Sequence, residues 1–328
     1  MNAEHDSFFP IADPPRQSFD FVPTARWVIQ RDDQLHRFIS GNKLRKLKYL
    51  VLKAKEDGHD TLLTFGGAFS NHLAATAAAG SEFGFKTIGI VRGEEVDLDN
   101  PTLALCLKQG MQLERVSRSD YDRKFDEDYK DELNRRFGRA LLIPEGGAHY
   151  LGVNGCIEII PKSERDEWEH VVVPGGTGTT AAGLLLSTGA DTTVWVYSSL
   201  KGGDFLREEI GNLLYRFLWD RDAVNEELNR LRVVTDYHFG GYGQVTDELV
   251  EFLNEFYRET DIPLDPIYTG KMMCGLVDAL RNDEGPDPDK HPPARARTLI
   301  IHTGGLQGIA GINARRKSLE RSLILYQG

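Results

Sequence analysis

The sequence lacks the features that would place it in a membrane or mark it for export. No run of about 18 apolar residues occurs along the chain, so no transmembrane helix is predicted. The N-terminal stretch MNAEHDSFFPIADPP carries acids and has no apolar segment of signal-peptide length. These absences favour a cytoplasmic protein with no membrane partner.

Cysteine is scarce, and metal-binding patterns are missing. The three cysteines, Cys106, Cys156 and Cys274, lie far apart and form no CxxC pair. The nine histidines show no HExxH spacing. We therefore predict no metal site, and we expect the cysteines to be buried free thiols in a reducing cytoplasm.

Positive charge is in deficit. The 39 Lys and Arg residues against 50 Asp and Glu residues give a formal net charge of −11. This balance argues against nucleic acid or an anionic membrane as the main partner. A small anionic ligand remains compatible with it, because a local group of basic residues can bind one. The length of 328 residues allows two domains or one large α/β unit.

What is present is an alternation of strand-like and helix-like segments, which predicts parallel sheets with crossover helices. Strands are predicted at 61–65, 87–92, 111–116, 140–145, 169–175, 192–200, 232–238 and 298–305. Helices are predicted at 70–84, 100–110, 123–138, 203–229, 245–259 and 271–281, and a Pro-, Asp- and Gly-rich loop at 282–297. The fold class is therefore α/β, with two neighbouring parallel-sheet units and a boundary near 150–165. Ligands of such sheets bind at the carboxyl ends of the strands.

A basic cluster follows Gly41 and Asn42, with four Lys or Arg residues between positions 43 and 48. On a helical wheel Lys43 lies within about 40° of Leu47 and about 20° of Leu50, on the apolar stripe. Arg45 and Lys48 fall toward the polar side, where we expect a solvated face, and Lys46 falls at the edge. Burial lowers the pKa of a lysine, and a neutral amine can form a Schiff base. The alternative is that Lys43 extends its ammonium group out to water.

Two strand–glycine–helix junctions have the pattern of an anion site, in which free N–H groups meet the positive end of the helix dipole. In GGAFSNH, Ser70 or Asn71 is expected to cap a helix. The alternative is an ordinary βα turn with no ligand, because such turns often carry a serine cap as well. In VVVPGGTGTT, the run from Gly175 to Thr180 has amides and hydroxyls suited to a phosphate. The latter also matches GxGxxA, but the next strand ends in serines rather than the acid of a dinucleotide site.

Three further strand-end segments place polar side chains beside glycines. They are FGGYGQ with Tyr242, DPIYTGK with Tyr268, and IHTGG with His302 and Thr303. A single tyrosine is more often a core residue than a catalytic one. Their repeated position after apolar runs favours a shared site.

Taken together, GNKLRKLKYL, GGAFSNH, GGTGTT, DPIYTGK and IHTGG resemble, in order, the 1-aminocyclopropane-1-carboxylate (ACC) deaminase and D-cysteine desulfhydrase family. This family belongs to the fold type II pyridoxal-phosphate (PLP) enzymes, related to the tryptophan synthase β subunit. The resemblance implies that fold, a PLP cofactor, an amino-acid substrate and a homodimer. It also implies a large PLP-binding domain of residues 1–45 and 160–328, and a small α/β domain of residues 46–159.

The resemblance implies roles for the matched positions. Lys43 matches the lysine that binds the cofactor through a Schiff base, and Asn71 a residue near its 3′-oxygen. The loop that binds the cofactor phosphate in the family is matched by Gly175, Gly176, Thr177, Gly178, Thr179 and Thr180. Thr303 matches a residue near the pyridine nitrogen, Tyr242 and Tyr268 match catalytic tyrosines, and Ser70, with Asn71 and His72, matches the site of the substrate carboxylate.

Three positions separate the two activities. The deaminases typically read SNQ, YEGK and HLGG, whereas this chain reads SNH, YTGK and HTGG, as the D-cysteine desulfhydrases do. We therefore expect a PLP-dependent lyase that eliminates hydrogen sulfide from D-cysteine. The alternatives are ACC deamination, elimination or replacement on another amino acid, a nicotinamide-dependent oxidoreductase using Gly176 to Ala181, and a non-catalytic small-molecule binding protein.

Overall fold

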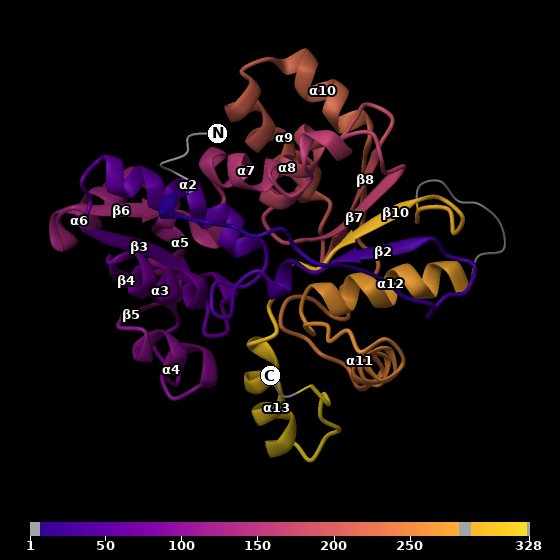
Figure 1. Cartoon of the computed structure of the whole chain (residues 1–328). Coiled ribbons are helices and arrows are strands. Elements are labelled where there is room, and N and C mark those ends of the chain that lie inside the picture. The colour runs from indigo at the N-terminus through magenta and orange to yellow at the C-terminus, as the bar shows by residue number, and fades with distance from the viewer. Residues whose placement is uncertain (1–6, 282–289, 327–328) are drawn as a thin grey trace.

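The computed structural model describes residues 7–281 and 290–326 of the chain, which form two sheets surrounded by helices (Figure 1). Residues 282–289 of the loop expected at 282–297 lie outside the described residues, and 290–297 form no helix or strand. No helix among the described residues is long and apolar enough to cross a bilayer.

The larger sheet has six strands in the order β1-β2-β10-β7-β8-β9. They are β1 (Arg16–Ser18), β2 (Trp27–Gln30), β7 (His170–Gly175), β8 (Thr193–Ser198), β9 (Leu231–Val234) and β10 (Thr298–Ile301). The β1–β2 pair is antiparallel and the other neighbours are parallel. The expected α/β class with parallel sheets is thus confirmed. The sequence reading missed β1 and β2, which are too short for their alternation to stand out.

Helices cover both faces of this sheet, and alternate residues of its strands explain why. Val171 and Val173 of β7 point into one core with α7 (Tyr150–Ile157), α8 (Thr179–Ser187), α9 (Phe205–Leu218) and α10 (Arg221–Asn229). Val172, between them, points into the other core with α11 (Asp247–Thr260), α12 (Thr269–Arg281) and α13 (Gly308–Ser318). A parallel strand buried on both faces reads as a continuous apolar run, which is why VVV was recognisable.

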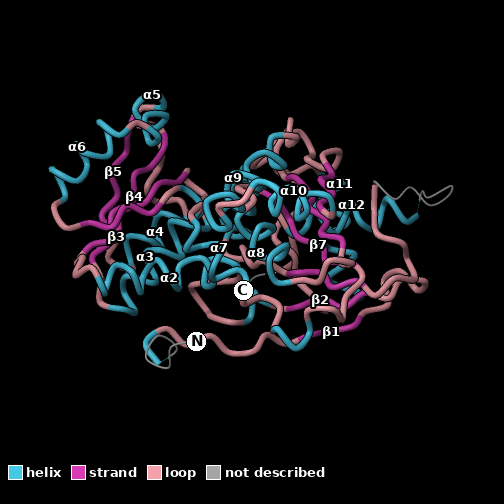
Figure 2. Tube along the Cα trace, turned by 90° about the horizontal axis from the view of Figure 1, so that it is seen from above, coloured by secondary structure: helices cyan, strands magenta, loops and turns pink. Residues whose placement is uncertain are grey.

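The smaller sheet has four parallel strands in the order β5-β4-β3-β6. They are β3 (Thr61–Gly66), β4 (Lys86–Arg92), β5 (Gln112–Val116) and β6 (Ala140–Ile143). Its helices are α2 (Asn42–Glu56), α3 (Asn71–Phe83), α4 (Pro101–Lys108), α5 (Arg118–Asp122) and α6 (Glu127–Phe137). Short 3-10 turns lie at Asp32–Gln34, Arg123–Phe125, Glu145–Gly147 and Lys162–Glu164. Figure 2 shows this sheet and its helices standing apart from β1, β2 and β7.

The predicted helix over 203–229 was wrong, because α9 and α10 are separate. Trp219 ends α9 in a left-handed conformation with φ 56°. Asp220 then starts α10, its side chain accepting hydrogen bonds from the N–H groups of Asp222 and Ala223. An aspartate N-cap within a charged run was the sequence signal for this break.

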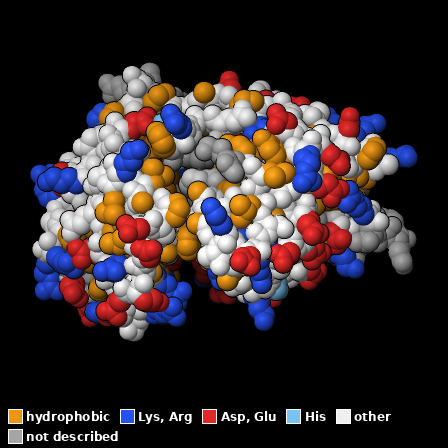
Figure 3. All heavy atoms as spheres, turned by 90° about the horizontal axis from the view of Figure 1, so that it is seen from below, with side chains coloured by type: hydrophobic (Ala, Val, Ile, Leu, Met, Phe, Trp, Pro, Cys, Tyr) orange, Lys and Arg blue, Asp and Glu red, His pale blue; other side chains and the backbone are white. Residues whose placement is uncertain are grey.

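The two sheets meet through α7, which packs against both α2 and α8 (Figure 1). The strands of the four-stranded sheet fall within residues 46–159, and those of the six-stranded sheet outside them. The domain division at those bounds stays a prediction. Seen from below, the surface is hollowed between the two lobes (Figure 3).

Cys106 and Cys156 are buried as expected, whereas Cys274 is half-buried.

Candidate active site

A cavity of ≈ 410 Å³ lies at the carboxyl ends of strands from both sheets. Pockets of 300–1,000 Å³ are typical of small-ligand sites. Nearly all residues singled out from the sequence line it: Lys43, Ser70, Asn71, His72, Gly175, Gly176, Thr177, Gly178, Thr180, Tyr242, Tyr268 and Thr303. Thr179 is fully buried beside it and is not among the lining residues. The fold therefore gathers segments that are more than two hundred residues apart in sequence.

The turn at Gly41 and Asn42 sets Lys43 into this cavity. Gly41 caps α2 with φ 64°, and a Cβ there would stand 1.9 Å from the carbonyl oxygen of Thr303, so only glycine fits. The Asn42 N–H donates to that same oxygen at 3.2 Å. The Asn42 side chain accepts from the Lys43 ammonium at 2.9 Å and donates to Thr180 Oγ1 at 2.9 Å. Asn42 thus links the lysine to the glycine loop.

The surroundings of Lys43 favour its neutral form. Burial, and next the nearby charge of Lys46, lower the pKa of Lys43 from 10.5 to about 7. Near neutral pH a large fraction of this amine is therefore unprotonated and nucleophilic. Lys46 is itself buried, and burial lowers its pKa as well. The ammonium group of Lys46 donates a hydrogen bond to the carbonyl oxygen of Gly146 at 3.4 Å.

The expectation of a solvated face for Arg45 and Lys48 was wrong, because both side chains are buried. Arg45 pairs with Asp32 at 2.8 Å, and Lys48 pairs with Glu158 at 2.9 Å. A helical wheel contains only the helix itself, so it could not show that carboxylates from other segments cover this side of α2.

The run from Gly175 to Thr180 forms a glycine-rich turn between the end of β7 and the start of α8. α8 starts after Gly178, which is left-handed with φ 75°, and it has no side-chain cap. Its first N–H groups therefore remain available to a ligand, at the positive end of the helix dipole. Gly176 lies against Tyr268, whose Cε1 would be 3.1 Å from an added Cβ. The hydroxyls of Thr177 and Thr179 meet at 3.0 Å.

The second junction, between β3 and α3, presents another helix N-terminus. Ser70 is the N-cap, and its Oγ accepts from the N–H of Leu73 at 3.2 Å. This confirms the predicted cap, and Ser70 also lines the cavity. Asn71 Oδ1 accepts from Gln307 Nε2 at 2.8 Å, so the segment after Gly305 orients this amide.

His72 is held as a neutral imidazole. Burial, and next the charges of Lys43 and Lys46, keep its pKa well below 6.5. Thr64 Oγ1 donates to the carbonyl of Ile143, so it accepts from His72 Nε2 at 3.0 Å. Nδ1 is then an acceptor, and it has no partner among the described residues. This tautomer favours a donor group on a ligand, while a role in binding the substrate carboxylate stays a prediction.

Tyr242 and Tyr268 face each other, with ring centroids 6.1 Å apart. Tyr242 forms an outer wall with 49% of its surface exposed, while its hydroxyl lies inward against Tyr268. Burial raises the pKa of both phenols above 10, so both are proton donors at neutral pH.

The DPIYTGK motif positions these tyrosines. Asp265 is fully buried, and its carboxylate accepts from the N–H groups of Ile267, Tyr268 and Thr269 at 2.7 to 3.0 Å. Lys271 donates to the carbonyls of His238 and Gly241 at 2.9 and 2.8 Å, which fixes the turn that carries Tyr242. The motif therefore holds both phenols at one place.

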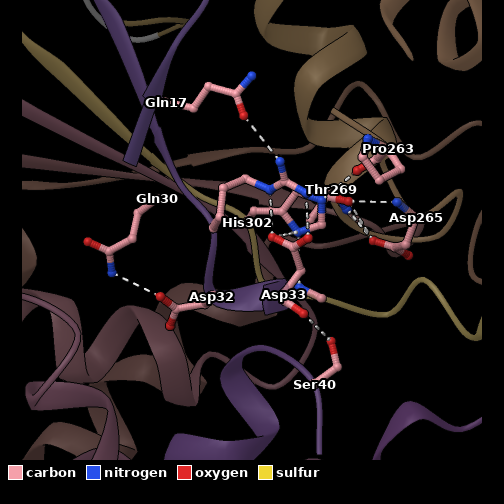
Figure 4. A network of polar contacts seen from close by, with 11 residues as sticks. Gln17, Gln30, Asp32, Asp33, Ser40, Pro263, Asp265, Thr269 and His302 are labelled. Carbon is pink, nitrogen blue, oxygen red and sulfur yellow. Dashed lines mark hydrogen bonds and ion pairs between the residues drawn. The ribbon is translucent and has the colours of Figure 1, made fainter. Parts of the chain in front are cut away.

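A buried polar network holds His302, the residue before Thr303 (Figure 4). Arg31 binds Asp33 through two hydrogen bonds of 2.9 and 2.8 Å. Asp33 lies 3.4 Å from Nδ1 of His302, whose Nε2 donates to the carbonyl of Pro263 at 2.7 Å. The N–H of Gly304 donates to the same Nδ1. His302 is thus a structural residue that anchors the end of β10.

Comparison with known proteins decides the kind of site. The family model described as "Pyridoxal-phosphate dependent enzyme" matches residues 23–304. The chain belongs to this family. Among curated relatives of this PLP-dependent enzyme, a protein of Pyrococcus horikoshii provisionally named a 1-aminocyclopropane-1-carboxylate deaminase is 32% identical over 85% of this chain and 84% of its own. A mitochondrial bifunctional D-cysteine desulfhydrase/1-aminocyclopropane-1-carboxylate deaminase of Arabidopsis thaliana is 30% identical over 87% of this chain and 73% of its own.

A solved structure described as an ACC deaminase homologue superposes with a TM-score of 0.77 and 28% identity, covering 97% of this chain and 100% of that one. The fold of a serine racemase from Dictyostelium discoideum is also similar, with a TM-score of 0.63 at 13% identity over 92% of this chain and 96% of that one. The resemblance to the ACC deaminase and D-cysteine desulfhydrase family, the type II fold and the PLP cofactor are thereby confirmed. The match to a family of PLP-dependent enzymes replaces the alternative interpretation of Gly176 to Ala181 as part of a dinucleotide site.

The cavity of this chain suits pyridoxal phosphate. The uncapped N-terminus of α8 offers amides for a phosphate, and Lys43 offers an amine of lowered pKa for an aldehyde. Among the lining residues that were not predicted from the sequence are Asn42, Lys46, Arg92 and Glu145. Asn42 and Lys46 stood inside the recognised motif. Arg92 and Glu145 are the last residues of the strands predicted at 87–92 and 140–145, and that position was their available signal.

Proposed function

We propose that this PLP-dependent enzyme is a D-cysteine desulfhydrase, which converts D-cysteine to pyruvate, hydrogen sulfide and ammonia. The observation that carries the proposal is that Lys43, whose pKa is lowered to about 7, and two protonated phenols line one cavity. A base and a pair of proton donors are what removal of a Cα proton and departure of a thiolate require.

Several residues would hold the cofactor. Lys43 would bind its aldehyde carbon, the amides from Gly175 to Thr180 its phosphate, Asn71 its 3′-oxygen side and Thr303 its pyridine nitrogen. When bound, pyridoxal phosphate supplies an electron sink for the negative charge left at Cα. Thr303 presents a neutral hydroxyl, which leaves that nitrogen largely unprotonated and suits elimination.

The chain's own groups then divide the work. The N–H groups and the hydroxyl at Ser70 and Asn71 bind and orient the substrate carboxylate at the N-terminus of α3. Lys43, released as an amine, accepts the Cα proton. Tyr268 and Tyr242 donate toward the leaving sulfur. The hydrosulfide departs with the electron pair of the Cβ–S bond, and the enamine product hydrolyses to pyruvate and ammonia.

ACC deamination is the second candidate, because the curated relatives carry that name. Opening the cyclopropane ring of ACC leaves negative charge on a ring carbon, and an acid must protonate that carbon. Of the residues that line the cavity, Glu145 alone is acidic, and Tyr121 and Lys124 already engage its carboxylate. Thr269 takes the place of the deaminases' glutamate, and its hydroxyl donates to Asp265 at 2.8 Å. These contacts support elimination over ring opening.

The test is an absorbance spectrum followed by a product assay. We expect a yellow holoenzyme that forms pyruvate and sulfide from D-cysteine at a kcat/KM at least about tenfold above that for 2-oxobutyrate formation from ACC. L-cysteine and L- and D-serine serve as stereochemical and leaving-group controls. Faster turnover of ACC would reverse the assignment, and binding of these amino acids without turnover would support a non-catalytic binding protein.

We also propose, from the resemblance alone, that the enzyme is a cytoplasmic homodimer. Light scattering coupled to gel filtration tests the dimer. A mass near 36.8 kDa, that of one chain, would contradict it.

A further inference from the structure

Part of the cavity wall comes from the carboxyl edge of the four-stranded sheet. β3 and β4 pair with Gly66 opposite Val91, and β3 and β6 pair with Thr64 opposite Ile143. Parallel pairing therefore delivers Arg92, Gly67 and Glu145, which follow these positions, to one edge. All three residues line the cavity.

Of the two charged residues that line the cavity from this edge, Arg92 and Glu145, Arg92 is the one with no ion pair among the described residues. Its guanidinium carbon lies 5.9 Å from the centroid of the Tyr121 ring, and the side chain is exposed. Within residues 7–281 and 290–326 it has no hydrogen bond or ion pair. Glu145 is engaged twice, by the Tyr121 hydroxyl at 2.8 Å and by Lys124 at 3.3 Å. Arg92 therefore offers an unpaired positive charge to the cavity.

This charge lies near the groups that would handle the leaving group. The carboxylate of Glu145 contributes to the raised pKa of both Tyr242 and Tyr268, so it lies within electrostatic reach of both phenols. Tyr121 joins Glu145 to Arg92. The α8 turn and the α3 N-terminus suit a phosphate and an α-carboxylate, which leaves Arg92 for the remaining end of an amino acid.

We propose that Arg92 binds the substituent on Cβ of the substrate, and that the enzyme prefers amino acids whose Cβ substituent carries negative charge, such as a thiolate. This inference rests on the proposed β-elimination. In that reaction the Cα proton passes to the enzyme, and the Cβ–X bond breaks with its electron pair on X. When X is a thiolate, the phenol of Tyr242 or Tyr268 gives it a proton, so that it leaves as hydrosulfide. A guanidinium beside X stabilises the charge that remains on X and develops there.

The test compares ligands that differ at Cβ and needs no turnover. Calorimetry on the holoenzyme would measure the Kd of D-aspartate, which has an anionic Cβ substituent, and of D-alanine, which has none. We expect Arg92→Gln to weaken D-aspartate about tenfold and to change D-alanine less than twofold, since a hydrogen-bonded charge is lost. Arg92→Lys should lie between the two, because it keeps the charge and loses the planar fork.

Lys86→Gln is the matched control, because it removes one positive charge from the opposite end of β4, about 20 Å away. It should change neither Kd. Equal weakening of both ligands by Arg92→Gln, or weakening of neither, would overturn the subsite.

Turnover separates this inference from the proposed function. If wild-type enzyme releases pyruvate from both D-cysteine and β-chloro-D-alanine and Arg92→Gln slows both equally, the lyase stands and the subsite falls. If no amino acid yields pyruvate but Arg92→Gln still weakens D-aspartate alone, the lyase falls and the anion subsite stands.

Discussion

The two sides of α2 use the same kind of residue in opposite ways. Arg45, Lys46 and Lys48 of its first two turns are buried and Lys43 is half-buried, yet Lys43 and Lys46 line the cavity and Arg45 and Lys48 do not. The second pair has carboxylate partners, Asp32 and Glu158. For Lys43 and Lys46, no carboxylate lies within ion-pair distance among the described residues.

The difference shows that the partner, rather than burial, decides what a buried cation does. A paired cation keeps its charge, because the attraction and hydrogen bonds offset desolvation. An unpaired one reduces the cost of burial by losing its proton, which lowers its pKa. Within six residues, one helix therefore holds two structural cations, each paired with a carboxylate, and a reactive amine.

The largest effect should come from Lys43→Ala. It removes the amine proposed to bind the cofactor and to accept the Cα proton, so we expect kcat/KM for D-cysteine to fall by at least about 10³-fold. Rapid mixing with D-cysteine and a sulfide assay would measure this. Turnover at the wild-type rate would refute the assignment of Lys43.

Replacing Lys43 should, in contrast, stabilise the apo-protein. The pKa of Lys43 is about 7 in the folded chain and 10.5 when unperturbed, so between these values the unfolded state binds more protons. Wild-type stability should then rise with pH across that window. Lys43→Met should lose this slope and unfold at a higher urea concentration at pH 7.

The second largest effect tests the other side of the helix. Arg45→Met leaves Asp32 buried without its cation, and breaking such a pair should lower the free energy of unfolding by about 3 kcal/mol. Urea unfolding monitored by circular dichroism measures it. The double variant Arg45→Met/Asp32→Asn is the control and should recover part of the loss. An unchanged midpoint would mean that the pair contributes nothing.

Sequence reasoning succeeded where the answer lay inside one element. The wheel placed Lys43 on the inner stripe of α2 from its spacing to Leu47 and Leu50, and the structure places it in the cavity. The glycine turn before α8 and the Ser70 cap were likewise local patterns. The resemblance then gathered the separate motifs into one site.

Sequence reasoning failed where a distant segment supplied the answer. Asp32 comes from a turn after β2, a strand too short to recognise, and Glu158 ends α7, which was not predicted. Without those partners Arg45 and Lys48 look solvated. Gln307, which binds Asn71, is 236 residues away from it in the chain, and nothing in either stretch predicts the contact.

A smaller effect should appear in the titration of the reactive amine. Lys46 lowers the pKa of Lys43 by charge repulsion, so Lys46→Met should raise that pKa by about half a unit or more. The rate at which apo-protein reacts with pyridoxal, which lacks the phosphate, follows the neutral amine. In wild type this rate should rise with pH through a midpoint near 7. An unmoved midpoint in the variant would show that Lys46 does not act on Lys43.

The smallest effect should come from Lys48→Met, and it limits the comparison. Its partner Glu158 has 21% of its side chain exposed, whereas the side chain of Asp32 has none. Glu158 also accepts from the hydroxyl of Tyr49. A carboxylate that reaches water tolerates the loss of its cation, so we expect about 1 kcal/mol, against about 3 for Arg45→Met. The pyridoxal titration should keep its wild-type midpoint in this variant. A loss as large as that of Arg45→Met would mean that exposure of the carboxylate does not govern these pairs.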